Sequence, residues 1–98
     1  MSGDWMEDKD KEILAEYNRI YGLFEQGEDI DMDVLDLLAS HEDLYKEKGL
    51  EDLANETFDN AWACILKDED ANGMLIALVS SFIAQYVNAI GGIDSVVP

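Results

Sequence analysis

One short polar run has the spacing of calcium ligands. Asp68, Asp70, Asn72 and Gly73 match the first half of an EF-hand loop, in which oxygen ligands alternate and a glycine makes the sharp turn. That loop ends in a bidentate glutamate, whereas this chain has Val79 at the corresponding position. Half a motif favours a polar turn in which Asp70 or Asn72 caps a helix, so no metal site is predicted. A calcium-responsive module is the alternative.

Residues suited to covalent or acid–base catalysis are scarce. The chain has one histidine, His41, and one cysteine, Cys64. A cysteine beside a histidine can act as a nucleophile, but both residues fall within helical apolar patterns and are expected at core or boundary positions. No glycine-rich phosphate loop is present. The sequence therefore predicts a protein that is not an enzyme and uses no cofactor.

Carboxylates form the densest chemical feature of the chain. Six of them lie within twelve residues that contain no lysine or arginine. They are Glu25, Glu28, Asp29, Asp31, Asp33 and Asp36. We call these six residues the acidic cluster. Carboxylates on a rigid scaffold present negative charge to a basic groove as phosphates do, so the acidic cluster is predicted to contact a partner.

The acidity extends through most of the chain. In 98 residues, 23 Asp and Glu against 6 Lys and Arg give a net charge of −17. A small domain needs a net charge of only about 2–8 for solubility, and self-repulsion opposes folding, so the excess indicates a further use. Direct binding to DNA or RNA is excluded because it requires a basic surface. The charge is concentrated in residues 1–70, since residues 71–98 carry only Asp94.

Four segments have the apolar spacing of amphipathic helices. Their apolar residues recur three and four positions apart. The predicted helices cover about residues 4–26, 31–48, 50–67 and 72–90. Four helices with short connections predict an all-α fold, a compact antiparallel bundle in a single domain over residues 1–98.

The ends of the predicted helices are marked by residues with known preferences. Asp31 or Asp33 is expected to cap the second helix. Gly27 and Gly49 stand where helices are expected to end. Gly22 lies inside the first helical pattern, where glycine destabilises a helix, and so indicates a close contact or a kink.

The last predicted helix is the apolar element of the bundle. Residues 71–93 contain no charged side chain, and that length is sufficient to cross a bilayer. Several polar residues interrupt the segment and no Lys or Arg flanks it, so it is predicted to be a core helix surrounded by the acidic helices, with no membrane contact. A homodimer through residues 74–90 is a second use of the same segment.

The cellular location follows from the cysteine content and the N-terminal sequence. A single cysteine allows no intrachain disulfide. The first ten residues have neither the basic region nor the apolar region of a secretory signal. These features favour a reducing compartment, and the cytoplasm is the predicted location.

Taken together, these features predict a non-enzymatic acidic inhibitor. It would block the basic surface of a nucleic-acid-binding protein or nuclease as a partial DNA or RNA mimic, in the manner of an anti-restriction or anti-CRISPR protein. One alternative is an immunity protein or antitoxin that recognises a nuclease toxin through aromatic anchors. The candidate anchors are Trp5, Tyr17, Tyr21, Tyr45 and Trp62. The other alternative is an oligomeric structural accessory protein assembled through the last helix.

Overall fold

Helices are the regular elements of the computed structural model, which describes residues 8–67 and 71–90. Five helices are assigned in these ranges, and no strand is. They are α1 (Asp8–Glu25), α2 (Asp31–Ser40), α3 (Glu42–Glu47), α4 (Glu51–Lys67) and α5 (Asn72–Ala89). The all-α prediction is therefore confirmed.

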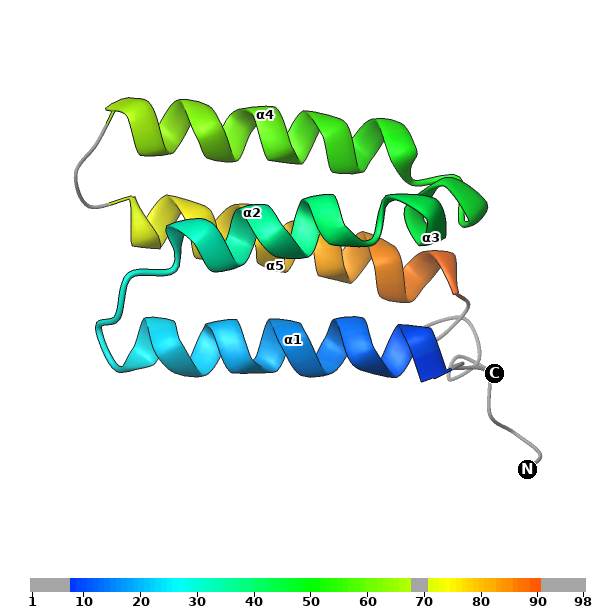
Figure 1. The fold of residues 1–98 in the computed structure, drawn as a ribbon, viewed down its shortest axis with the longest axis horizontal. Coiled ribbons are helices and arrows are strands. Elements are labelled where there is room, and N and C mark those ends of the chain that lie inside the picture. The colour runs from blue at the N-terminus through cyan, green and yellow to red at the C-terminus, as the bar shows by residue number, and fades with distance from the viewer. Residues whose placement is uncertain (1–7, 68–70, 91–98) are drawn as a thin grey trace.

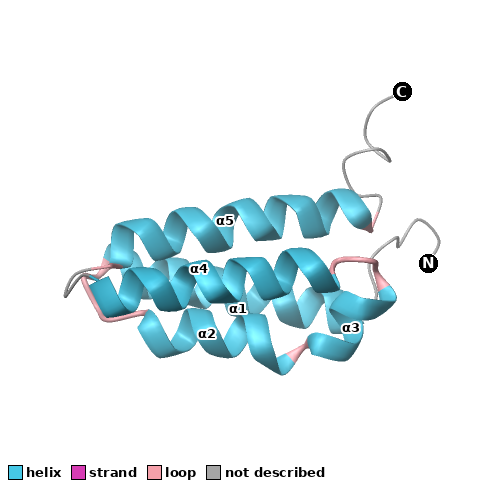
Figure 2. Cartoon of the chain, turned by 90° about the horizontal axis from the view of Figure 1, so that it is seen from above, coloured by secondary structure: helices cyan, strands magenta, loops and turns pink. Residues whose placement is uncertain are grey.

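The helices α1, α2, α4 and α5 form an antiparallel bundle. Figure 1 shows α2 and α5 between α1 and α4. From above, α2 and α5 lie on opposite sides of α4 (Figure 2). α2 and α5 each pack against both α1 and α4, so the bundle has a diamond-shaped cross-section, and the short α3 packs against α4.

The core lies where the apolar stripes of these helices meet. Its fully buried side chains come from all five helices and the α1–α2 connection, and α4 contributes the small Ala61. The largest are Tyr45, Tyr86, Phe82, Ile13, Ile20, Ile30, Leu37 and Leu75. The Tyr45 ring packs edge-on against Phe82, with ring centroids 4.8 Å apart, and against Tyr86 at 5.9 Å. Such edge-to-face contacts add to the burial of aromatic surface.

The second predicted helix is two helices in the structure. A continuous helix over residues 31–48 was expected, but the backbone breaks at His41, with φ −116° and ψ 31°. The break turns α3 so that Tyr45 enters the core, where its hydroxyl donates a hydrogen bond to the Leu37 carbonyl over 2.7 Å. This bond satisfies a carbonyl in the last turns of α2, where helical partners run out.

Two glycines end helices as the sequence predicts. Gly27 and Gly49 have φ values of 80° and 77°, the left-handed region that favours glycine. The Glu28 amide donates to the Leu23 carbonyl over 2.9 Å, and the Leu50 amide donates to the Tyr45 carbonyl over 2.7 Å. Both are the long-range bonds of the Schellman motif, which explains why α1 and α3 stop where they do.

The apolar helix α5 contributes to the core from one side. Its buried residues are Leu75, Val79, Phe82, Ile83 and Tyr86. Met74, Ala77, Ser81 and Ala84 lie on the other side and are exposed. The remaining helices therefore do not surround α5, and it presents an uncharged face to solvent.

Gly22 is a position where a side chain is expected to stabilise the fold. α1 continues through Gly22, and a Cβ atom added there meets nothing within 4 Å, so the close contact expected from the sequence is absent. We predict that Gly22→Ala raises the free energy of unfolding by about 0.5–1 kcal/mol, because alanine loses less backbone entropy in a helix. Urea denaturation measures the change. Gly27→Ala is the control and is expected to destabilise the protein, since its φ of 80° is strained for alanine.

Candidate partner-binding surface

The acidic cluster lies at the end of the bundle where α1 meets α2. Glu25 is the last residue of α1, Glu28 and Asp29 are in the connection, and the other three residues are in α2. Figure 1 shows this connection at the same end as the last turn of α4 and the first turn of α5. Glu25, Glu28, Asp29 and Asp36 are exposed, while Asp31 and Asp33 are half-buried. The structure therefore brings the six predicted residues to one region, with four of them open to solvent.

Carboxylates of the acidic cluster also have structural partners within the fold. Asp33 forms an ion pair with Arg19 of α1 over 3.2 Å, so a base absent from the local sequence reaches the acidic cluster through the fold. The Asp29 carboxylate accepts a hydrogen bond from the Asp31 amide over 3.0 Å. The residue before α2 is Ile30, which makes no side-chain cap, so neither Asp31 nor Asp33 is the cap that the sequence predicted. Asp36 accepts a hydrogen bond from the Ser40 hydroxyl over 2.7 Å.

Asn72 joins the start of α5 to the α1–α2 connection through two hydrogen bonds. Its amide nitrogen donates to the Glu28 carbonyl over 2.7 Å, and its amide oxygen accepts from the Ile30 amide over 3.4 Å. α5 is preceded by Ala71 without a side-chain cap, so Asn72 connects two segments rather than capping its own helix. The backbone that carries Glu28 and Asp29 is thereby held against the start of α5.

The half-motif for calcium is only partly described. Asp68 and Asp70 lie outside the described residues. Of the remaining members, Asn72 uses both amide atoms on the α1–α2 connection and Gly73 belongs to α5. Within residues 8–67 and 71–90, no group of three acidic, histidine or cysteine side chains is arranged to hold a metal ion.

Exposed apolar side chains gather at the same end of the bundle. Met32 lies in the first turn of α2 and is 72% exposed. Met74 lies in the first turn of α5 and is 59% exposed. Trp62 and Leu66 lie in the last turns of α4 and are 40% and 79% exposed. Large apolar side chains beside a charged rim are typical of a protein-binding surface. The sequence identified Trp62 as a candidate anchor and included Met74 in the 74–90 homodimer segment. It did not single out Met32 or Leu66, because isolated apolar residues are common on surfaces.

The other aromatic anchor candidates differ in their exposure. Tyr45 is fully buried, so it is not a contact residue and that expectation is wrong. Tyr17 is half-buried, and its hydroxyl forms a 2.7 Å hydrogen bond with the Ser80 hydroxyl of α5. Tyr21 is 41% exposed on α1, and Trp5 lies outside the described residues. Tyr21 and Trp62 are the aromatic candidates that remain accessible.

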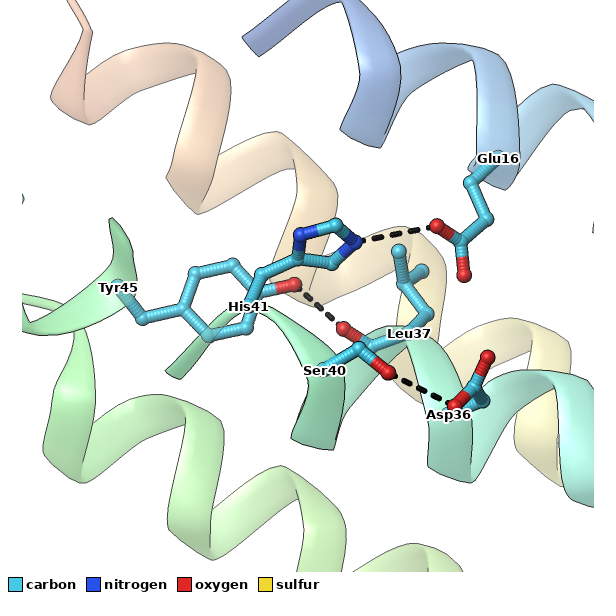
Figure 3. A network of polar contacts seen from close by, with 6 residues as sticks. All are labelled: Glu16, Asp36, Leu37, Ser40, His41 and Tyr45. Carbon is cyan, nitrogen blue, oxygen red and sulfur yellow. Dashed lines mark hydrogen bonds and ion pairs between the residues drawn. The ribbon is translucent and has the colours of Figure 1, made fainter. Parts of the chain in front are cut away.

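The α2–α3 break forms a second polar site (Figure 3). His41 Nε2 lies 3.1 Å from Glu16 Oε1, which joins the break to α1, and both side chains are largely covered. The neighbouring pocket has a volume of about 440 Å³ and is lined by polar residues of α1 and of the break, including Lys9, Glu12 and Ser40.

This site does not bring a catalytic pair together. The His41 ring faces Glu16 and the Ser40 hydroxyl donates to Asp36, so neither group activates the other. Cys64 lines a different pocket, between α4 and α5. The His41–Cys64 pair that the sequence allowed is therefore not assembled.

A buried carboxylate near the start of α1 is the feature that the sequence reading missed. Asp10 is 1% exposed and accepts a hydrogen bond from the Tyr86 hydroxyl. Burial raises the pKa of Tyr86 above its ordinary value, and the bond to Asp10 and the negative charge of Asp10 raise it further. Burial, followed by the charge of Glu16, also raises the pKa of Tyr45. In the sequence, Asp10 stands between Lys9 and Lys11 and resembles the many other acidic residues of the chain. Only its spacing to Ile13 and Tyr17 places it on the buried stripe of the helix.

The chain matches no protein-family model, no curated protein and no solved structure. No helix in the described ranges combines the length and apolar character needed to cross a membrane.

Proposed function

We propose that this protein is a non-enzymatic acidic inhibitor. It binds the basic surface of a nucleic-acid-binding protein or nuclease and blocks it as a partial mimic of DNA or RNA, as an anti-restriction or anti-CRISPR protein would. The acidic cluster makes the first contacts, and the cytoplasm is where such a partner is met.

The supporting observation is that the exposed carboxylates are left largely uncompensated. Between residues of the described ranges, basic and acidic side chains pair at two places, Arg19 with Asp33 and His41 with Glu16. The chain carries a net charge of −17, and α4 adds Asp52, Glu56 and Asp59 on exposed positions. Such a field attracts a basic groove and raises association rates by roughly 10- to 1000-fold. Rigid helices hold these charges in place, which lowers the entropy cost of binding.

A second candidate function is an immunity protein or antitoxin that recognises its target mainly by shape. The exposed Met32, Trp62 and Leu66, at the same end of the bundle as the acidic cluster, favour it, because buried apolar anchors dominate many interfaces. Alanine substitution of Trp62 and Leu66 distinguishes the two. A larger loss of binding from these substitutions than from neutralising the acidic cluster favours the second function. An oligomeric accessory protein is the third candidate, and a strict monomer in light scattering contradicts it.

The main test combines capture with charge neutralisation. The immobilised chain is used to isolate proteins from a lysate at low salt, and each captured protein is assayed for DNA and RNA binding with and without the chain. We expect the chain to compete with nucleic acid, and the competition to weaken steeply as salt rises.

The acidic cluster is then tested through association rates. A variant with Glu25→Gln, Glu28→Gln, Asp29→Asn and Asp36→Asn keeps the hydrogen-bond acceptors and removes four charges. We expect it to associate about tenfold more slowly in stopped-flow measurements. The control removes four exposed charges elsewhere, through Asp8→Asn, Glu42→Gln, Asp43→Asn and Glu47→Gln. Equal slowing by both variants contradicts a special role for the acidic cluster, and salt-insensitive binding contradicts the proposed function.

A further inference from the structure

A groove runs along the surface between α4 and α5, which lie side by side (Figure 2). It has a volume of about 310 Å³, and most of its lining is apolar. Its walls are Asn60, Ala63, Cys64 and Lys67 from α4, and Met74 and Leu78 from α5. No side chain of the described residues fills it, and Met74 at its edge is 59% exposed.

Helical spacing places further exposed residues in line with the two walls of the groove. On α4, Glu56 precedes Asn60 by one turn, so the exposed Glu56 lies on the same stripe as the groove wall. On α5, Ser81 and Gln85 follow Leu78 on the same stripe. The α4 stripe from residue 56 to residue 67, which includes the groove wall, spans roughly 17 Å at a rise of 1.5 Å per residue, or about three helical turns.

The charges beside the groove determine what it can bind. α5 carries no charged residue, so the whole α5 wall is neutral. The α4 wall has Glu56 at one end and Lys67 at the other, and Asp52 and Asp59 lie on the exposed surface beside it. A ligand with an apolar face and basic residues on the side toward Glu56 complements these walls. An anionic ligand is repelled by the field of the chain, whose net charge is −17.

We infer that the α4–α5 groove binds a short amphipathic helix of the basic partner. The apolar face of this helix covers Ala63, Met74 and Leu78, and its lysines or arginines lie over Glu56 and the neighbouring carboxylates of α4. This inference rests on the proposed function for the basic character of the partner. It adds an apolar contact that selects a helix among basic surfaces, which charge attraction alone does not do.

A synthetic peptide of about 14 residues, or four helical turns, tests the groove directly. Its leucines are three and four positions apart and its other positions carry lysine and alanine. The comparison peptide has the same composition with the leucines distributed around the helix. Cys64 is the single cysteine and lines the groove, so its rate of reaction with a small disulfide reagent reports occupancy. We expect the amphipathic peptide at saturation to slow this reaction by roughly tenfold, and the comparison peptide to leave it nearly unchanged.

Variants locate the binding site. Met74→Glu is expected to lower the affinity for the amphipathic peptide by about tenfold or more, because an apolar anchor is lost. Glu56→Gln is expected to weaken it by a few-fold, with a smaller salt dependence. Ala15→Glu is the control, because Ala15 is also an exposed apolar residue but lies on α1, outside the groove. Its affinity is expected to stay within about twofold of the unmodified chain.

Three results would overturn the inference. Equal affinity of both peptides, without protection of Cys64, means that charge alone binds them, and the proposed function then stands without the groove. Absence of binding by either peptide also removes the groove as a helix site. A stable dimer in sedimentation, with Cys64 already protected before any peptide is added, means that a second copy of the chain occupies the groove.

Discussion

Replacing Tyr45 with alanine is expected to lower the free energy of unfolding by about 3–5 kcal/mol, as for other large aromatic residues of a core. The Tyr45 ring is fully buried and packs on Phe82 and Tyr86. Its removal leaves a cavity among α2, α3 and α5, and the Leu37 carbonyl loses its hydroxyl donor. Because domains of this size have a total stability of only about 5–15 kcal/mol, much of the chain is expected to unfold near body temperature. Circular dichroism during urea denaturation measures the change.

Tyr45→Phe separates the packing contribution from the hydrogen bond. It keeps the ring contacts and removes only the bond to the Leu37 carbonyl, so a loss of about 1 kcal/mol is expected. A loss as large as that of the alanine variant would show that the hydroxyl, rather than the ring, holds α3 in place. Met32, which is 72% exposed, supplies the surface control, and Met32→Ala is expected to change stability by less than about 0.5 kcal/mol.

Stability is expected to fall steeply in alkaline solution. Burial raises the pKa of both Tyr45 and Tyr86 above the ordinary value of 10.0, so each tyrosine holds its proton more tightly in the folded chain than in the unfolded chain. The resulting stabilisation is complete below pH 10 and is lost as the pH rises above 10, because unfolding then releases protons. Each such group contributes a slope of up to about 1.4 kcal/mol per pH unit. Urea midpoints measured between neutral pH and strongly alkaline pH follow this loss.

Phenylalanine variants identify the groups responsible. Tyr86→Phe is expected to reduce the loss of unfolding free energy per pH unit above pH 10. Adding Tyr45→Phe to this variant is expected to reduce the loss further. Tyr86→Phe also takes a donor from the buried Asp10, so its stability at neutral pH is expected to be lower by about 1–3 kcal/mol. Tyr21→Phe, at an exposed position, is the control for the slope. An unchanged slope in the double variant would contradict the assignment to these two residues.

The helices of this fold could be predicted from the spacing of apolar residues and from the glycines at helix ends. The stripes of Ile13 and Ile20 on α1 and of Leu75 and Val79 on α5 follow the helical period, and they are the buried positions in the structure. The break at His41 was not readable, because Leu37, Leu44 and Tyr45 also satisfy one continuous helical stripe. The helix breaks because of a tertiary contact, since the Tyr45 ring packs against Phe82 and Tyr86 of α5.

The candidate surface was predicted only in part. Clustering of carboxylates along the chain located the region, since charges this close in sequence stay close in a short connection. The ion pair of Asp33 with Arg19 and the attachment of the connection by Asn72 join residues 14 and 42–44 positions apart, which no local pattern indicates. The α4–α5 groove likewise depends on how two helices are set against each other, so its lining could not be read from either helix alone.

The hydrogen bonds between α1 and α5 bear on how the protein is made. Tyr17 with Ser80 and Tyr86 with Asp10 join residues 63 and 76 positions apart. During translation α1 emerges well before α5 has been synthesised, so its apolar stripe lacks this partner while the intervening helices form. Contacts across so long a loop are costly in chain entropy, so the contacts between α1 and α5 are expected to form late in folding. We expect the negative charge of the intervening segments to keep nascent chains apart during this interval, when the apolar stripe of α1 is incompletely covered.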